Sequence, residues 1–160
     1  MDYFAIFSLP VAFEIDLSAL EAAYFKAQRQ FHPDRFVGKP ATEKLAALQK
    51  SMDINKAYET LKDPLKRARY LLSLQGIIVG TANDSIRPSP ALLTEIMELR
   101  EEEVKLEEIE LLKAECLQKI AESYKQSDFE KMAQEVLRLG YLLPTKVGIQ
   151  LDPVSSTGVV

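Results

Sequence analysis

The residues of this chain that are best suited to chemistry lie in one short stretch, Phe31-His32-Pro33-Asp34-Arg35-Phe36. The stretch holds the only histidine of the sequence, with a carboxylate two positions later and Arg29 shortly before it. A His-Asp pair can act as a general base with its orienting partner when the two side chains face each other beside a nucleophile or a metal. Across a single proline that geometry is doubtful, so two other interpretations compete with catalysis.

The proline determines the kind of backbone that carries these side chains. Pro33 fixes its own φ and moves His32 out of the helical region, so the preceding helix ends here and a loop begins. The loop can be an ordinary helix-ending turn in which Asp34 caps a local group. It can also be a stiff recognition loop that presents the imidazole and the carboxylate, flanked by Arg29 and Arg35. The tripeptide alone leaves these alternatives open.

Two segments with helical periodicity must position this loop. Ser18-Ala19-Leu20-Glu21 has the form of a capping box, which predicts a helix from Ser18 to Phe31. A second helix is predicted over residues 41–61, after Gly38-Lys39-Pro40 closes the loop. We expect an antiparallel pair with the loop at its tip. Its facing apolar stripes would be Leu20, Tyr24, Ala27 and Phe31 on one helix and Leu45, Leu48, Met52, Tyr58 and Leu61 on the other.

Shorter elements complete the helical pattern. Asp2 can cap a short helix that Pro10 stops, and Asp63-Pro64 predicts a further helix that Gly76 ends. Residues 76–89 form a connector, and Ser89-Pro90 opens a second helical region without Gly or Pro up to Gly140. We predict a three-helix bundle over residues 90–143, with a break near 104–108 and a third helix entered at Ser127-Asp128. A proline at position 144 predicts a loose tail over residues 144–160.

Composition excludes several classes of function. The chain is 47% hydrophobic and 28% charged, as globular proteins are. Residues 1–80 carry 11 Lys and Arg against 9 Asp and Glu, whereas residues 81–160 carry 9 against 15, so the two halves can have different roles. The overall acidity argues against binding to nucleic acid. A Gly-rich phosphate loop, Gly-x-Ser-x-Gly and His-Glu-x-x-His are absent from the sequence.

Cysteine usage and hydropathy indicate the compartment. Cys116 is the only cysteine, which excludes an intramolecular disulfide and a cysteine-cage metal site and agrees with a reducing environment. One cysteine and one histidine cannot furnish the ligand set of a metal cluster, so we predict no cofactor and no metal site. We find neither a membrane-spanning run nor a signal peptide, and we expect a cytoplasmic protein that is complete from Met1 and does not contact membranes.

The order of several motifs resembles that of J-domains, the co-chaperone modules that stimulate ATP hydrolysis by seventy-kilodalton heat-shock-type chaperones. In that family the His-Pro-Asp loop and the basic helix before it dock onto the chaperone. By this resemblance His32, Pro33 and Asp34 bind the chaperone, supported by Lys26, Arg29 and Arg35. The landmarks are Asp2-Tyr3-Phe4, His32-Pro33-Asp34-Arg35-Phe36, Ile54-Asn55-Lys56-Ala57-Tyr58-Glu59-Thr60-Leu61-Lys62-Asp63-Pro64 and Arg67-Ala68-Arg69-Tyr70-Leu71-Leu72.

The second half narrows the resemblance to the HscB family, also called Jac-type, which serves iron–sulfur cluster biogenesis. An N-terminal J-domain is followed here by an acidic helical region that opens with Leu92-Leu93-Thr94-Glu95-Ile96-Met97-Glu98-Leu99-Arg100-Glu101. In that family this region binds the scaffold IscU, which implies an IscU-type scaffold and an HscA-type chaperone as partners. The scaffold-binding residues implied by motif are Leu93, Met97, Glu98, Glu101 and Tyr141. On periodicity alone, Leu93 and Met97 could equally belong to the core.

The sequence therefore predicts an all-α protein with a J-domain over residues 1–75, a linker over 76–89 and the bundle over 90–143. We expect a co-chaperone without enzymatic activity that delivers the scaffold to the chaperone and stimulates its ATP hydrolysis. One alternative is a J-domain co-chaperone for other clients. Another is a small hydrolase using His32 and Asp34, for which the sequence supplies neither a nucleophile nor a metal set.

Overall fold

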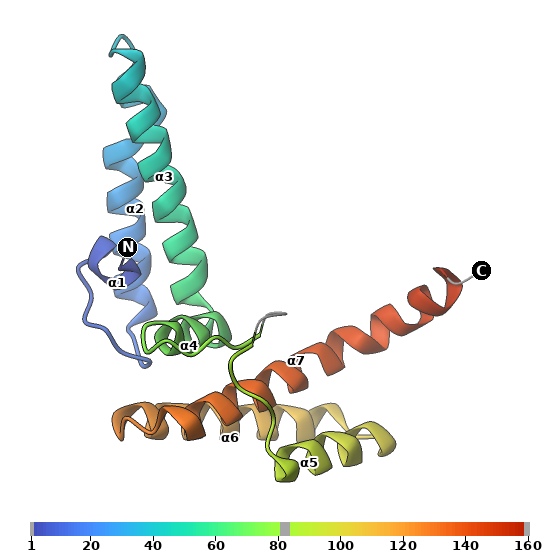
Figure 1. Cartoon of the computed structure of the whole chain (residues 1–160). Helices are drawn as coiled ribbons and strands as arrows, with labels where there is room; N and C mark the ends of the chain where they lie inside the picture. Colours follow the sequence, from blue (N-terminus) through green and yellow to red (C-terminus); the bar gives the residue numbers. More distant parts are fainter. Residues whose placement is uncertain (1, 81–83, 159–160) are drawn as a thin grey trace. The chain divides into compact units, whose positions relative to one another are not determined.

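The computed structural model describes residues 2–80 and 84–158, with side chains described up to Leu143, and the regular secondary structure of these residues is entirely helical (Figure 1). The predicted all-α fold, an N-terminal J-domain with an antiparallel helix pair and a C-terminal three-helix bundle, is confirmed. Two compact units comprise Met1–Arg67 and Ala68–Val160. The boundaries predicted at 75/76 and 89/90 stay predictions. Within the described residues, none of the helices is long and apolar enough to cross a membrane.

The first unit is built around the pair formed by α2 (Leu17–Phe31) and α3 (Ala41–Lys62), which lie side by side with the connecting loop at their tip (Figure 1). Asp2 caps α1 (Tyr3–Ile6), because its carboxylate accepts a hydrogen bond from the Phe4 N–H group (2.9 Å). The cap predicted at Ser18 is wrong: the Asp16 side chain accepts from Ser18 and Ala19, two positions earlier than the capping box implied. The unit also contains the short 3-10 helix η1 (Pro33–Phe36) and the first turn of α4 (Pro64–Ser73), which continues past Arg67.

The seam between α2 and α3 is polar in its middle portion. The Gln28 amide nitrogen donates to the Asn55 side-chain oxygen (2.6 Å), and the Ser51 hydroxyl donates to the Gln28 amide oxygen (3.1 Å). The Tyr24 hydroxyl also donates to Asn55 (2.8 Å), while the Tyr24 ring stacks on Tyr58 with 4.0 Å between the centroids. Directional hydrogen bonds of this kind fix which turn of one helix faces which turn of the other.

The predicted apolar stripe of α3 is only partly correct. Leu61 is fully buried, as predicted, but Leu45, Leu48 and Met52 are exposed. The inward side of α3 carries Ala47, Ile54, Ala57 and Leu61. The prediction failed because the polar side chains described above occupy the seam that the sequence pattern assigned to leucines.

A buried arginine closes the base of the first unit. The Arg67 guanidinium donates from Nε to the Phe13 carbonyl and from Nη1 to the Leu61 carbonyl, both at 2.6 Å, and it lies 5.0 Å from the centroid of the Phe13 ring. Burial lowers the pKa of Arg67, although an arginine side chain stays charged at any physiological pH. One side chain thus fastens the segment before α2 to the end of α3.

The bundle of the second unit consists of α5 (Pro90–Glu101), α6 (Leu106–Lys125) and α7 (Phe129–Gly158). Ser89 caps α5 as predicted, since its hydroxyl accepts from the Leu92 N–H group (3.2 Å). The break between α5 and α6 falls at residues 102–105, slightly before the predicted position. Helices α6 and α7 lie side by side (Figure 1), and their apolar side chains form the core. Its members include Ile109, Cys116, Ile120, Met132, Val136 and Leu142.

Helix α7 does not stop where the sequence predicts. It continues across Pro144 to Gly158, so the loose tail predicted for residues 144–160 is wrong as far as position 158. Proline removes one backbone hydrogen bond from a helix, but its fixed φ of about −65° is itself helical, so the backbone can continue.

We predict that Arg67→Met lowers the free energy of unfolding by about 2 kcal/mol, because it leaves two buried carbonyl groups without donors. The measurement is urea denaturation followed by circular dichroism. Lys66→Met, at the exposed neighbouring position, is the control and should change the value by less than about 0.5 kcal/mol. Equal values for the two variants would contradict the role given to Arg67.

Candidate functional site

His32 joins two helical elements at the tip of the first unit. It is the C-cap of α2 and the N-cap of η1, with φ −61° and ψ 135°, the extended backbone that Pro33 imposes. Its Nδ1 atom accepts a hydrogen bond from the Asp34 N–H group (3.2 Å), and its carbonyl accepts from the Arg35 N–H group (2.9 Å). The loop is therefore tied down by its own side chain.

The arrangement of His32 and Asp34 does not match a general base with its orienting carboxylate. The Asp34 Oδ2 atom lies 3.6 Å from His32 Nδ1, and both side chains are exposed. In a catalytic pair, the carboxylate accepts a hydrogen bond from an imidazole N–H group. Here Nδ1 is already an acceptor toward the Asp34 backbone. The geometry is that of a local cap with both groups presented outward.

An open groove of about 590 Å³ lies on α2 beside this loop. Its lining consists of Phe25, Gln28, Arg29, His32 and Arg35. Three of the predicted chaperone-binding residues, Arg29, His32 and Arg35, therefore meet in one place. Lys26 is exposed on α2 but does not line the groove. Sequence reasoning missed Phe25 and Gln28, although Gln28 could have been noticed as a polar residue on the helix face expected to be buried.

On α5, the structure excludes the core interpretation of Leu93 and Met97, and their role in binding stays a prediction. Leu92 and Ile96 point into the core, whereas Leu93 and Met97 are 47% and 61% exposed. Leu93 and Met97 are four residues apart, so they lie on one outward stripe. Glu98 and Glu101 are exposed on the same helix. We call Leu93, Met97, Glu98 and Glu101 the α5 face.

Tyr141 lies next to the end of this helix. The Arg100 guanidinium sits 5.1 Å from the centroid of the Tyr141 ring, a cation–π contact between α5 and α7. Arg100 follows Met97 by three positions, so it borders the α5 face on the side of Tyr141. The aromatic residue predicted from the motif is thus brought to the α5 face, and Arg100 is a neighbour that the sequence reasoning did not select.

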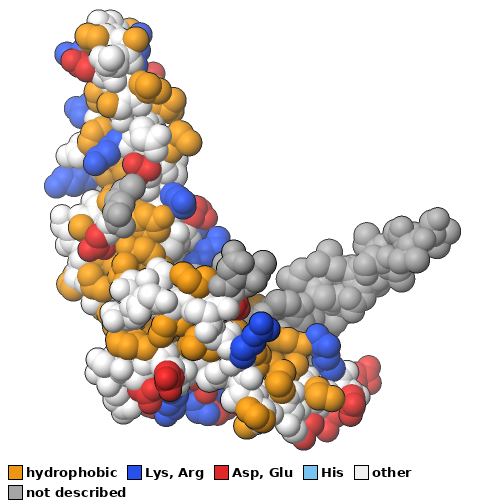
Figure 2. Space-filling view, in the orientation of Figure 1, with side chains coloured by type: hydrophobic (Ala, Val, Ile, Leu, Met, Phe, Trp, Pro, Cys, Tyr) orange, Lys and Arg blue, Asp and Glu red, His pale blue; other side chains and the backbone are white. Residues whose placement is uncertain are grey.

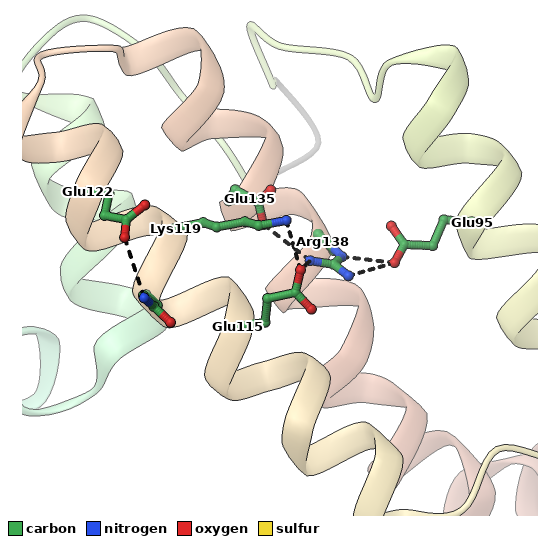
Figure 3. A network of polar contacts seen from close by, with 7 residues as sticks. Glu95, Glu115, Lys119, Glu122, Glu135 and Arg138 are labelled. Atoms are coloured by element: carbon green, nitrogen blue, oxygen red, sulfur yellow. Dashed lines mark hydrogen bonds and ion pairs between the residues drawn. The ribbon is translucent and has the colours of Figure 1, made fainter.

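A second arginine holds α5 against the other two helices of the bundle (Figure 3). Arg138 of α7 is buried and donates from Nε and Nη2 to the Glu95 Oε1 atom of α5 (3.0 and 2.7 Å). Its Nη1 atom lies 3.5 Å from Glu135 and 3.8 Å from Glu115 of α6. Lys119 also contacts Glu115, at 2.8 Å. This network fixes the rotation of α5 and hence the side that it exposes.

The chain's cysteine lies inside this bundle. Cys116 is fully buried, and burial raises the pKa of its thiol to about 12. A thiol becomes a nucleophile or a metal ligand only as the thiolate. Cys116 is therefore protonated at neutral pH and serves as an apolar core residue.

Comparison with known proteins agrees with this geometry. The family model for the DnaJ domain matches residues 2–70. Chaperone HscB from Vibrio cholerae is 33% identical with a TM-score of 0.77, covering 98% of this chain and 99% of that one. Human co-chaperone protein HscB is 30% identical with a TM-score of 0.80, covering 97% and 83%. The Jac1 co-chaperone from Saccharomyces cerevisiae shares the fold at 19% identity, with a TM-score of 0.65 over 94% and 97%.

The helix pair with an outward His-Pro-Asp loop, joined to a helical bundle, is the architecture of a J-domain co-chaperone. With two relatives at 30% identity or more that match along nearly its whole length, the chain belongs to the HscB family.

We predict that Arg138→Met lowers the free energy of unfolding by about 3 kcal/mol, because it leaves the carboxylates of Glu95 and Glu135 without their buried partner. Urea denaturation measures this change. Lys131→Met, on the exposed side of the same helix, provides the control. A loss no larger than that of the control would show that the network contributes little.

Proposed function

We propose that this protein is a cytoplasmic co-chaperone of iron–sulfur cluster assembly. It binds an IscU-type scaffold, delivers the scaffold to an HscA-type chaperone and stimulates the ATP hydrolysis of that chaperone. The observation that carries the proposal is the presence of two exposed surfaces of different chemistry, one on each unit, in a chain of the HscB family. The first is cationic around His32, and the second is apolar and acidic on α5.

On the first unit, the groove beside His32 suits an acidic protein surface. Arg29 and Arg35 supply fixed positive charge, which speeds association and orients the partner. Pro33 stiffens the loop, and the hydrogen bond from the Asp34 N–H group to His32 holds the imidazole in place. Because Pro33 and this hydrogen bond restrict the loop, it loses less conformational entropy on docking than an unrestrained loop would. Lys26 adds charge at the edge of this surface.

On the second unit, the α5 face combines apolar and acidic groups. Leu93 and Met97 offer apolar area that the bundle does not use, and Glu98 and Glu101 surround it with negative charge. An interface with an apolar centre and a charged rim gains affinity from the centre and selectivity from the rim. Tyr141, held by Arg100, extends the surface onto α7. The scaffold would need an apolar patch with basic residues around it.

The two binding events are coupled through the chaperone. The bundle selects the client, while the His-Pro-Asp loop favours the state of the chaperone that hydrolyses ATP. In this proposal ATP is bound and hydrolysed by the chaperone, and the chain itself has no catalytic role. The proposal assigns iron and sulfur to the scaffold as its cargo.

For the loop, we predict that His32→Gln abolishes stimulation of the HscA-type chaperone while scaffold binding is unchanged. The imidazole is exposed, its hydrogen bond to the Asp34 N–H group is local, and the Gln side-chain oxygen can accept the same bond, so the melting temperature should change little. Steady-state ATP hydrolysis and isothermal titration calorimetry with the scaffold are the measurements. ATP hydrolysis by the purified protein alone, or full stimulation by the variant, would refute the proposal.

For the client surface, we predict that Leu93→Ala combined with Met97→Ala weakens scaffold binding by tenfold or more, since about 0.8 kcal/mol is lost for each buried methylene group. Circular dichroism should show an unchanged fold, because both side chains lie outside the core. Leu106→Ala with Leu111→Ala removes two similarly exposed leucines from α6 and serves as the matched control. An equal loss of affinity in the control would mean that the α5 face is not the specific site.

A further inference from the structure

Helix α5 is attached to the bundle by fewer apolar contacts than α6. Two side chains of α5, Leu92 and Ile96, are buried, whereas α6 buries five; both helices lie wholly within the described residues. With 12 residues, α5 also has a length at which an isolated helix is marginally stable in water. Its seating therefore depends strongly on the polar contacts that it makes with α7.

Three residues of α7 hold α5 at its start, middle and end. Gln134 contacts the segment that opens α5. Arg138 binds Glu95 in the middle of α5. The Tyr141 ring lies beside Arg100 at its end. Because the three residues of α7 are four and three positions apart, they lie on one side of that helix.

The first of these contacts is a clamp on the backbone. The Gln134 side-chain nitrogen donates to the Arg87 carbonyl (2.8 Å), and the side-chain oxygen accepts from the Ser89 N–H group (2.9 Å). Ser89 is the N-cap of α5, and its carbonyl accepts the hydrogen bond of the Leu93 N–H group (2.9 Å). One carboxamide thus fixes the point at which α5 begins, one hydrogen bond away from Leu93.

The chemistry of this clamp explains why a carboxamide occupies the position. A carboxamide carries a donor and an acceptor at once, so it can satisfy a backbone carbonyl and a backbone N–H group together. A carboxylate would leave the Arg87 carbonyl without its donor, and an apolar side chain would satisfy neither group. Gln134 is uncharged and half-buried, so neither an ion pair nor the packing of the core accounts for it.

The clamp acts on the helix that carries the α5 face. Figure 2 shows hydrophobic side chains exposed over α5. Leu93 and Met97 are presented in one direction only while α5 is seated on α7, because a helix that detaches or rotates carries its side chains with it. The seating of α5 is therefore a condition for presenting this face.

We propose that Gln134 is a positioning residue for scaffold binding, which seats the start of α5 on α7 and so presents the α5 face before the scaffold arrives. This inference rests on the proposed function, because the α5 face is the scaffold site there. Gln134 acts through α5 and does not touch the scaffold. When the binding-competent state is populated for a fraction of the time, the apparent affinity falls by that fraction.

The test separates association from dissociation. Rate constants for the IscU-type scaffold are measured by surface plasmon resonance with full-length Gln134→Met, which keeps the length of the side chain and removes both hydrogen bonds. We expect the association rate constant to fall about fivefold or more, since fewer molecules have α5 seated. The dissociation rate constant should stay within about twofold, because α5 is seated in the complex. Gln118→Met, at an exposed position of α6, is the matched control and should change neither.

Two comparisons identify the cause of the effect. Leu93→Ala with Met97→Ala removes contacts to the scaffold, so it should instead raise the dissociation rate constant. Gln134→Glu keeps the acceptor for the Ser89 N–H group and should give an association rate constant between those of Gln134→Met and the wild type. Amide hydrogen exchange of Gln134→Met should be faster in residues 90–101 and unchanged in residues 106–125, which also shows that the bundle is folded.

The outcomes distinguish this inference from the proposed function. An association rate constant equal to that of the wild type overturns the inference. A change confined to dissociation also overturns it, because Gln134 would then contact the scaffold directly. Equal acceleration of exchange in α5 and α6 overturns it as well, since Gln134 would then support the whole bundle. If the wild type does not bind the scaffold, the proposed function itself has failed.

Discussion

The hydrogen bonds among Gln28, Ser51 and Asn55 set the register of α2 against α3 toward the tip of the first unit. An apolar seam tolerates small sliding of one helix along the other, whereas a ladder of donors and acceptors is satisfied in one register only. His32 lies one helical turn beyond Gln28, so this register also determines where the imidazole is presented. The same ladder occupies the seam, and Leu45, Leu48 and Met52 lie outside the core.

In the second unit, α5 carries two neighbouring pairs of apolar residues, one in the core and one on the surface. Leu92 and Ile96 are buried, while Leu93 and Met97, one position later in each case, are exposed. Hydrophobicity cannot tell these pairs apart, which is why the sequence could not decide between core and binding face. The decision depends on the rotation of the helix, which the long-range ion pair between Arg138 and α5 fixes. A charged pair 43 residues apart leaves no local signal in the sequence.

The fold itself was largely predictable because its boundaries depend on local chemistry. Caps at Asp63 and Ser89 and the end of α2 before Pro33 arise from side chains within a few residues of each other. The Gly76 turn, with its φ of 80°, is equally local. Two errors concern positions where the sequence offers similar local signals. The cap of α2 is Asp16 and not Ser18, and helix α7 continues across Pro144, where its end was predicted. The stripe of α3 was misjudged because its partner helix offered polar groups.

The distribution of burial along the α2–α3 pair has a consequence for local unfolding. Phe4, Leu20 and Ile54 are buried near the base, but Ala47 is the last buried side chain of α3 toward the tip, and residues 41–46 are all exposed. The free energy needed to open the helix locally therefore decreases toward the loop, since few apolar contacts are lost there. In the proposed function the chaperone docks at this end, which is also the end whose backbone can adjust at the lowest cost. A partner that docks here would lower the population of locally unfolded states at this end of the pair. Docking would then slow amide hydrogen exchange at residues well beyond the contact itself.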